Sequence, residues 1–272
     1  MMDNELYKTK HEMWLKILFA SFAIDDEAIK SKLYDFSQMA FRHMKWIGDT
    51  ILRQGDDYNY DRDMMLYKRQ SVFEVLRPLK EDILKTQKLY GDSVLFGRIK
   101  SDEEYLLGYI DELLADKTND KPVEAFSMKN RYGDLDATSL MNLTMFLFEE
   151  SYKEYELILV YAYMQARTKN LAEFDVFQDL IDESHFHLKS FGNLMAKLGI
   201  LALPRELHEL TYKIRDLKKF IEDGIKEEEA AKEMCRELSS SINDKKLSYF
   251  FEFIDAQESY HIELMKRLLD EQ

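Results

Sequence analysis

The sequence predicts an all-α fold built from two four-helix bundles in tandem. Only 9 of the 272 residues are glycine and 3 are proline, and a chain so poor in helix-breaking residues is typical of long helices with short connections. Apolar residues recur every three or four positions along eight segments, the pattern of helices that bury one face. A long polar stretch separates four of these segments from the other four, which predicts two domains.

The same periodicity gives approximate bounds for each helix. In chain order, the predicted helices cover residues 4–23, 26–53, 62–90, 97–116, 139–168, 171–199, 205–241 and 244–271. The longest polar loop is expected at 115–139, because this stretch contains proline, glycine and many small polar residues. The expected domains are a first bundle, a linker and a second bundle, at 1–118, 119–138 and 139–272.

The two halves resemble one another in sequence, which predicts an internal repeat. Three segments of the first half align without gaps on three segments of the second: 12–19 on 154–161, 43–55 on 187–199 and 102–114 on 257–269. These matches fall in the same order in both halves. The second of them pairs His43 with His187 and Gly55 with Gly199.

Composition and charge exclude several classes of protein. The chain is 46% hydrophobic and 33% charged, which is typical of a globular protein rather than a disordered one. Its formal net charge of −14 argues against nucleic acid and anionic membranes as partners. The single cysteine, Cys235, excludes an internal disulfide and any four-cysteine metal centre. No signal peptide or bilayer-spanning run is evident, so we expect a cytoplasmic location.

The last predicted helix carries the sequence Glu258-Ser-Tyr-His261. Residues three apart share one helix face, so this pair can present two ligands to one point. With about 100° per residue, Ile254, Met265 and Leu268 all lie within about 40° of the histidine. The pair therefore points into the apolar core, where a carboxylate needs a hydrogen-bonding partner or a metal ion.

A second inward histidine lies in the sixth predicted helix. His187 is centred on an apolar face that contains Leu180, Phe191, Leu194 and Leu198. Glu183 lies one turn earlier, at about −40°, whereas His185 points about 160° away and is set aside. The Glu-x-x-His spacing of the last helix would require a glutamate at 184, where Ser184 stands. Glu183 would have to reach the same region from the preceding position.

Two further carboxylates come from the helices that precede these histidines. Glu154 shares an inward face with Leu147, Leu157, Ile158 and Tyr161. Glu228 lies near the apolar line through Ile221, Ile225, Ala231 and Cys235, and Glu227 replaces it if the helical register shifts by one residue. His187 follows Glu154 by 33 residues, and His261 follows Glu228 by the same number. Two antiparallel hairpins would thus bring four carboxylates and two imidazoles together.

Residues 139–271 resemble the ferritin-like superfamily of di-iron and di-manganese carboxylate proteins, near rubrerythrin, bacterioferritin and manganese catalase. The resemblance lies in Glu154 of EYELILVY, Glu183 and His187 of DESHFHLKSFG, Glu228 of KEEEAAKEM, and Glu258 and His261 of ESYH. It implies a fold of two tandem ferritin-like four-helix bundles, with two iron or manganese ions bound by the second. A complete rubrerythrin is excluded, because one cysteine cannot form a rubredoxin-type module.

The resemblance also implies a role for each ligand. Glu154 and Glu228 would be terminal carboxylates, and Glu258 would bridge the two metals. His187 and His261 would provide one imidazole per metal. Glu183 inherits the second bridging role, although Ser184 departs from the family pattern.

The first half resembles a degenerate copy of the second. Ligand-like positions are occupied by Glu12, His43, Glu74 and Glu103. Ala40 stands where a carboxylate is expected, and Leu106 replaces the second histidine. With these donors missing, the first half is expected to be structural or to bind one ion weakly.

The leading functional interpretation is an oxidoreductase that reacts with peroxide or dioxygen and uses an unidentified reductant. Peroxidase, catalase and ferroxidase chemistry share this ligand set, so the reaction and the choice of iron or manganese stay open. One alternative is non-catalytic iron binding or storage, compatible with a homo-oligomer. Another is a metal-free helical scaffold or interaction protein. Tyr161 and Tyr260 lie near the ligands and are expected to pack in the core.

Overall fold

The computed structural model describes residues 4–63, 69–133, 135–201 and 205–270. Within these ranges the secondary structure is helical, apart from one isolated β-bridge between Ser71 and Pro122. This confirms the all-α prediction. Among the described helices, none combines the length and the apolar character needed to cross a membrane.

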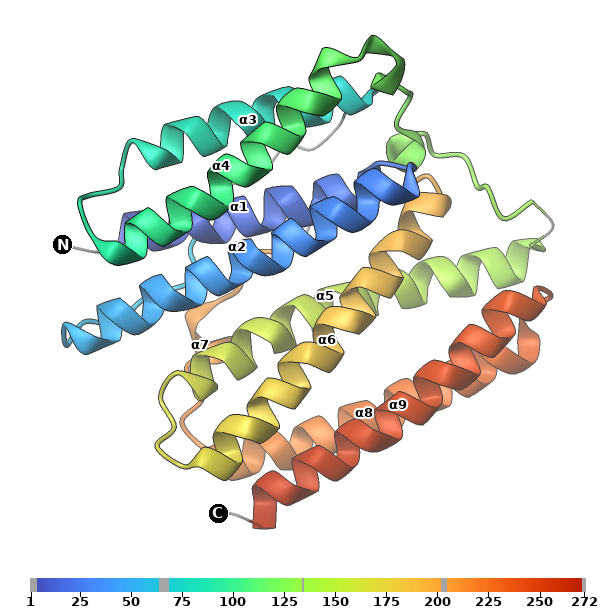
Figure 1. Cartoon of the computed structure of the whole chain (residues 1–272). Coiled ribbons are helices and arrows are strands. Elements are labelled where there is room, and N and C mark those ends of the chain that lie inside the picture. Colours follow the sequence, from blue (N-terminus) through green and yellow to red (C-terminus); the bar gives the residue numbers. More distant parts are fainter. Residues whose placement is uncertain (1–3, 64–68, 134, 202–204, 271–272) are drawn as a thin grey trace. The chain divides into compact units, whose positions relative to one another are not determined.

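In the described residues, eight long helices and one short one follow one another along the chain (Figure 1). Their bounds are α1 Asn4–Ala23, α2 Glu27–Arg53, α3 Val72–Gln87, α4 Val94–Ala115, α5 Ala137–Gln165, α6 Leu171–Lys197, α7 Glu209–Tyr212, α8 Leu217–Ser241 and α9 Lys245–Asp270. Two 3₁₀ turns, Lys117–Asn119 and Glu124–Phe126, lie in the loop between α4 and α5.

Two predicted helices differ from the structure at their starts. In each case a local N-cap fixes the residue at which the observed helix begins. The predicted helix 62–90 begins only at Val72, where the Ser71 side chain accepts a hydrogen bond from the Glu74 N–H. Residues 64–68 of that prediction lie outside the described part. The predicted helix 205–241 is divided into α7 and α8, and Asp216 caps α8 by accepting from the Lys219 N–H. The spacing of apolar residues alone does not reveal such N-caps.

The chain divides into two compact units, and each unit has its own core. Unit 1 comprises Met1–Lys129 and Ala196–Glu206, and unit 2 comprises Asn130–Met195 and Leu207–Gln272. Unit 1 contains α1 to α4. Unit 2 contains α5, nearly all of α6, and α7 to α9.

The core of unit 1 is rich in aromatic side chains. Trp14 of α1 is fully buried and lies against Phe41 of α2, with ring centroids 4.9 Å apart. The loop after α2 adds Tyr58 and Tyr60, and Tyr58 stacks on Tyr7 at 4.4 Å. α1 also packs on α3, and α4 packs on both α2 and α3. All four helices therefore share this core.

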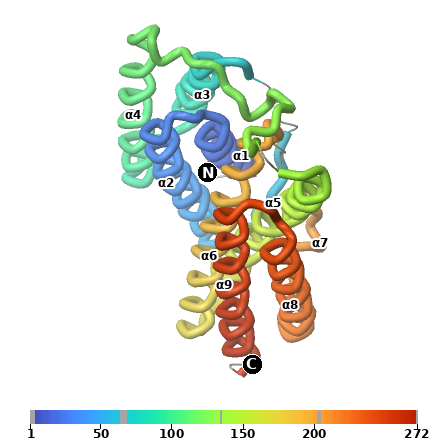
Figure 2. The backbone as a smooth tube through the Cα atoms, turned by 90° about the vertical axis from the view of Figure 1, so that its right-hand side faces the viewer, coloured from blue at the N-terminus to red at the C-terminus, as the bar shows by residue number. Residues whose placement is uncertain are grey.

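In unit 2, α5 contacts each of the other three long helices. Phe146 packs edge-to-face on Phe191 of α6 and Phe251 of α9. Further along α5, Tyr161 contacts Phe220 of α8. Figure 2 shows α8 and α9 side by side, and these two helices pack along their length. Glu154 lies between Phe146 and Tyr161 on the buried face of α5, so its carboxylate enters the core of unit 2.

Candidate metal centre

The six predicted ligands lie together in unit 2, and all of them except Glu183 are buried. α5 provides Glu154 and α8 provides Glu228, while α6 and α9 each provide one glutamate and one histidine. Their donor atoms form three overlapping groups, each within 4.8 Å: Glu154, His187 and Glu258; Glu228, Glu258 and His261; and Glu183, His187 and His261. Four helices thus contribute to one polar cluster.

The Glu258 carboxylate lies between the two histidines. Its Oε1 is 3.4 Å from Nδ1 of His187, and its Oε2 is 3.0 Å from Nδ1 of His261. The histidine ring centroids are 5.0 Å apart. Each ring has a second carboxylate nearby, Glu154 at 2.8 Å from His187 and Glu228 at 3.9 Å from His261. The cluster is therefore two histidine–glutamate pairs that share one central carboxylate.

Glu183 lies at the edge of this cluster. Its side chain is 29% exposed, and its Oε2 is 3.9 Å from Nε2 of His261. The neighbouring Ser184 is buried, and its hydroxyl has no hydrogen-bond partner among the described residues. His185 is also buried, but it belongs to none of the three groups of donor atoms. Glu183, rather than its neighbours, is the residue of this segment that reaches the histidines.

The α8 residue that joins the cluster is Glu228 rather than Glu227. Glu228 is 8% exposed and belongs to the cluster, whereas Glu227 is exposed. Of the two tyrosines expected in the core, Tyr161 is buried beside the ligands. The prediction for Tyr260 is wrong, because this side chain is 44% exposed. Tyr260 directly precedes His261 and so lies about 100° from it around α9.

Gln257 is a site residue that the sequence reasoning missed. Its amide nitrogen donates to the Glu183 carboxylate at 3.2 Å, and its amide oxygen lies 3.2 Å from Nε2 of His187. Because the amide oxygen can only accept, Nε2 of His187 carries the proton and donates it. Nδ1 of His187, which faces Glu154 and Glu258, is then the nitrogen available to bind a metal. The alignment of Gln257 with Asp102 is the feature of the sequence that could have identified it.

Glu150 is a second buried carboxylate that was missed. It is 5% exposed, lies one turn before Glu154 on α5, and forms an ion pair with Lys153 at 2.9 Å. Burial raises the pKa of Glu150 to about 7, although the ion pair opposes this change. The helical spacing from Glu154 could have indicated its inward position.

Burial and close like charges alter the protonation of the ligands. Burial lowers the pKa of His187, but Glu154 and Glu258 more than offset this and raise it to about 9. Burial and the neighbouring Glu228 raise the pKa of Glu258 to about 8. Burial also acts to lower the pKa of His261, but the nearby carboxylates of Glu228 and Glu258 raise it well above its usual range. Near pH 7, protons therefore balance part of the negative charge of the cluster.

The donor set fits a pair of divalent cations. Oxygen-rich ligands with one imidazole per metal suit iron or manganese. Buried donor atoms also have unused capacity, because Oε2 of Glu154 and Nε2 of His261 have no hydrogen-bond partner among the described residues. Four ionised carboxylates would balance two divalent ions, with both imidazoles neutral.

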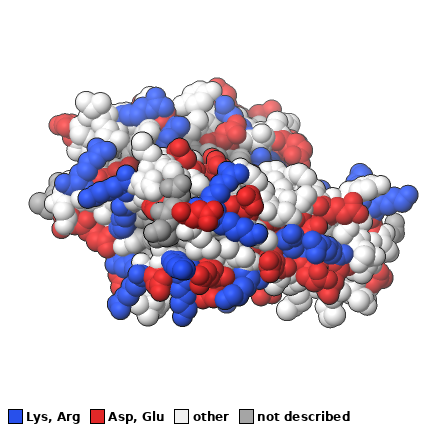
Figure 3. All heavy atoms as spheres, turned by 90° about the horizontal axis from the view of Figure 1, so that it is seen from below, with Lys and Arg blue, Asp and Glu red and all other residues white. Residues whose placement is uncertain are grey.

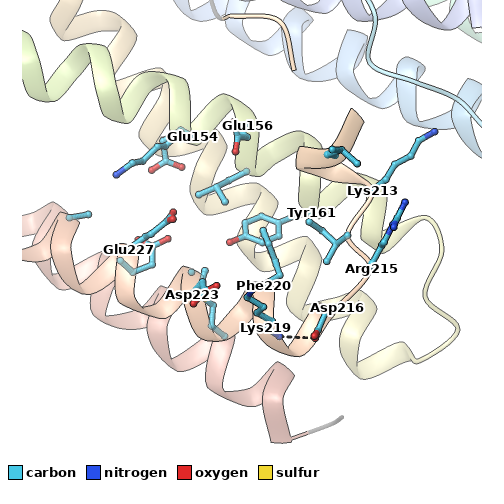
Figure 4. A pocket seen from close by; sticks show the side chains of 18 of the residues that line it. Glu154, Glu156, Tyr161, Lys213, Arg215, Asp216, Lys219, Phe220, Asp223 and Glu227 are labelled. Atoms are coloured by element: carbon cyan, nitrogen blue, oxygen red, sulfur yellow. Dashed lines mark hydrogen bonds between the residues drawn. The ribbon is translucent and has the colours of Figure 1, made fainter. Parts of the chain in front are cut away.

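A cavity of about 460 Å³ leads to one side of the cluster (Figure 4). Glu154 and Glu228 line it, together with Tyr161, whose side chain points into the cavity. The Tyr161 hydroxyl is buried and has no hydrogen-bond partner among the described residues. The cluster is therefore accessible from this side through a pocket of ligand size.

The corresponding region of unit 1 contains a cation supplied by the protein itself. Lys10 is fully buried, and its Nζ lies 2.6 Å from the Glu103 carboxylate. The Tyr90 hydroxyl donates to the same carboxylate at 2.6 Å. Nε2 of His43 lies 3.0 Å from Asp102, the residue before Glu103. The buried charges of this region are therefore paired within the protein.

The other two ligand-like residues of unit 1 have local roles. Glu12 accepts a hydrogen bond from the Asp63 N–H. Glu74 is exposed and accepts from the Gln70 N–H, as part of the cap at the start of α3. In the described residues of unit 1, no group of histidine and acidic donor atoms gathers as closely as in unit 2.

Surface charge adds no single-sign patch on the face drawn in Figure 3. Acidic and basic side chains are interspersed there.

Comparison of the chain with protein-family models, with curated proteins and with solved structures finds no match.

Proposed function

We propose that unit 2 is a ferritin-like four-helix bundle that binds two iron or manganese ions, and that the protein is an oxidoreductase acting on peroxide or dioxygen. The observation that carries the proposal is the convergence of His187 and His261 on the shared carboxylate of Glu258. A structural role alone would not require so many titratable groups in one apolar core, because burying each of them costs free energy.

Each ligand has a position that suits its proposed role. Glu154 and Glu228 each lie beside one histidine, Glu154 beside His187 and Glu228 beside His261. Glu258 is placed to bridge, with one oxygen toward each ring. Glu183 would provide the second bridge or a ligand to the metal of His261. When bound, the metals would supply redox equivalents and open coordination positions to a small oxidant.

We also propose that the two units arose by duplication and that unit 1 lost its metal site. Two aligned features support this history, one a side-chain contact and the other a glycine conformation. His43 lies beside Asp102 in unit 1, and His187 lies beside Gln257 in unit 2, so two aligned pairs of residues make the same contact. Gly55 and Gly199, which are also aligned, both follow a helix end with positive φ, at 84° and 73°.

Turnover by metal-loaded protein tests the enzymatic part. The full chain would be loaded anaerobically with iron or manganese, and consumption of hydrogen peroxide and of dioxygen would be followed with a chemical reductant. We expect turnover by the wild type and its loss in the Glu258→Ala, His261→Ala double variant. Glu263→Ala, an exposed position on α9, is the matched control and should keep it. Metal-loaded protein with no turnover of either oxidant would favour storage.

A further inference from the structure

The cavity beside the metal centre differs in charge between its two ends. Figure 4 shows Glu154 and Glu227 at one end, near the cluster, and Lys213 and Arg215 at the other. Tyr161 and Phe220 lie between them. A ligand that spans the cavity would therefore place one end beside the metal ligands and the other end beside basic side chains.

Two of the basic residues at the outer end are available to a ligand. Lys213 is already paired with Glu209. Arg215 and Lys219 form no ion pair within the part of the chain that the structure describes. Two of the acids that line the cavity are engaged elsewhere, because Asp216 caps α8 and Asp223 pairs with Lys226 at 2.7 Å. An arginine and a lysine in this arrangement are suited to bind a carboxylate.

The middle of the cavity suits an apolar chain or ring. Its apolar lining comes from α5, α8, α9 and the segment before α8, and consists of Leu157, Leu210, Ile214, Phe220, Ala231 and Met265. The Tyr161 hydroxyl, which lines this cavity, is buried and has no hydrogen-bond partner among the described residues. It can hydrogen-bond to a polar atom of a ligand near the cluster.

The size of the cavity exceeds what peroxide or dioxygen requires. Its volume is about 460 Å³, whereas one water molecule takes up about 30 Å³ in the liquid. Cavities of roughly 300–1,000 Å³ are typical of sites for organic ligands. The cavity therefore has room for an organic molecule larger than a small oxidant.

We propose that this cavity binds an amphipathic organic acid, with its carboxylate at Arg215 and Lys219 and its apolar body against Phe220 and Leu157. The other end of the acid lies beside Tyr161 and the metal ligands. The role of the acid as a substrate rests on the proposed metal centre. Its binding rests only on the cavity.

Calorimetric titration of the full chain with decanoate tests this proposal. The titration would be run on chelator-treated and on metal-loaded protein, with metal content measured on the same samples. We expect saturable binding of one decanoate per chain. The Arg215→Gln, Lys219→Gln double variant should bind at least 10-fold more weakly, while Lys218→Gln, at an adjacent exposed lysine paired with Glu222, should bind as the wild type does.

Two further measurements distinguish carboxylate recognition from simple apolar binding. Decan-1-ol should bind at least 10-fold more weakly than decanoate, and Leu157→Trp should abolish binding by filling the cavity. Absence of decanoate binding, or equal affinity of wild type and double variant, would overturn the proposal. If decanoate binds to a protein that takes up no metal, the acid site stands and the metal centre fails. If metal binds and decanoate does not, the reverse holds.

Discussion

The two units place buried carboxylates in similar helical surroundings but balance their charge differently. In unit 1, Lys10 lies against Glu103, and Arg98 lies 3.0 Å from Asp102. Each of these two acids is thus paired with a basic side chain. In unit 2, four carboxylates surround two imidazoles, and no lysine or arginine lies within ion-pair distance of any of the six ligands in the described structure.

This difference leaves the side chains of the unit 2 cluster with more negative than positive charge. Even with both imidazoles protonated, four ionised carboxylates would leave two negative charges in an apolar core. The raised pKa of Glu258, about 8, reflects this excess. Unit 1 has no such excess, and its ammonium group occupies the space beside Glu103. The two units should therefore respond differently to mutation, to added metal and to pH.

The largest expected effect is the loss of the buried cation in unit 1. Lys10→Met leaves the Glu103 carboxylate buried without its ion pair, and should destabilise unit 1 by about 3–5 kcal/mol. Both tryptophans, Trp14 and Trp46, lie in unit 1, so urea unfolding followed by tryptophan fluorescence reports this unit.

Lys16→Met is the matched control for this prediction. Lys16 lies on the same helix and pairs with Asp82 at 3.0 Å, but its side chain is 26% exposed. Its replacement should cost less than about 1 kcal/mol. Equal effects of the two substitutions would show that the buried ammonium does not balance Glu103. Metal uptake should be the same in both variants, because unit 1 has Leu106 in place of the second imidazole.

The next effect concerns the residue that orients His187. Gln257→Leu removes the acceptor for Nε2 of His187, and should weaken metal binding by roughly 10- to 100-fold. Gln257→Glu keeps an acceptor, as Asp102 does beside His43, and should retain most of the affinity. Competition with a chelator of known affinity measures both variants. An unchanged affinity of Gln257→Leu would remove Gln257 from the metal centre.

The two units should also respond to pH in opposite directions. In unit 1, burial lowers the pKa of His43 to about 4 and that of His11 to about 3. The unfolded chain then binds more protons below pH 6.5, so unit 1 loses stability as the pH falls from about 6.5 toward 4. Each histidine contributes about 1.4 kcal/mol per pH unit in this window.

Chelator-treated unit 2 should become less stable as the pH rises. The folded state holds an extra proton on Glu258 between about pH 4.5 and 8, and on His187 between about 6.5 and 9. Urea unfolding at pH 5, 7 and 9 tests both units, with tryptophan fluorescence for unit 1 and the remaining far-UV circular dichroism transition for unit 2. If the stabilities of the two units changed with pH in the same direction, the proposed difference in their charge balance would be contradicted.

The sequence predicted more of unit 2 than of unit 1. Helical periodicity located the inward faces, and so it identified Glu258, His261 and the other four residues of the cluster. It missed Lys10, because a charged residue in an amphipathic pattern is assigned to the surface unless its partner on another helix is known. Gln257 was missed for the same reason. The break before α8 depends on the Asp216 cap, which competes with an otherwise continuous helical pattern.

Metal content per chain tests the central claim most directly. Protein produced with iron and manganese available would be measured by elemental mass spectrometry, together with the Glu258→Ala, His261→Ala double variant and the Glu263→Ala control. We expect about two metal ions per chain in the wild type and the control, and none in the double variant. Wild-type protein without metal after anaerobic loading, or a double variant that retains the same metal content, would contradict a dinuclear centre in unit 2.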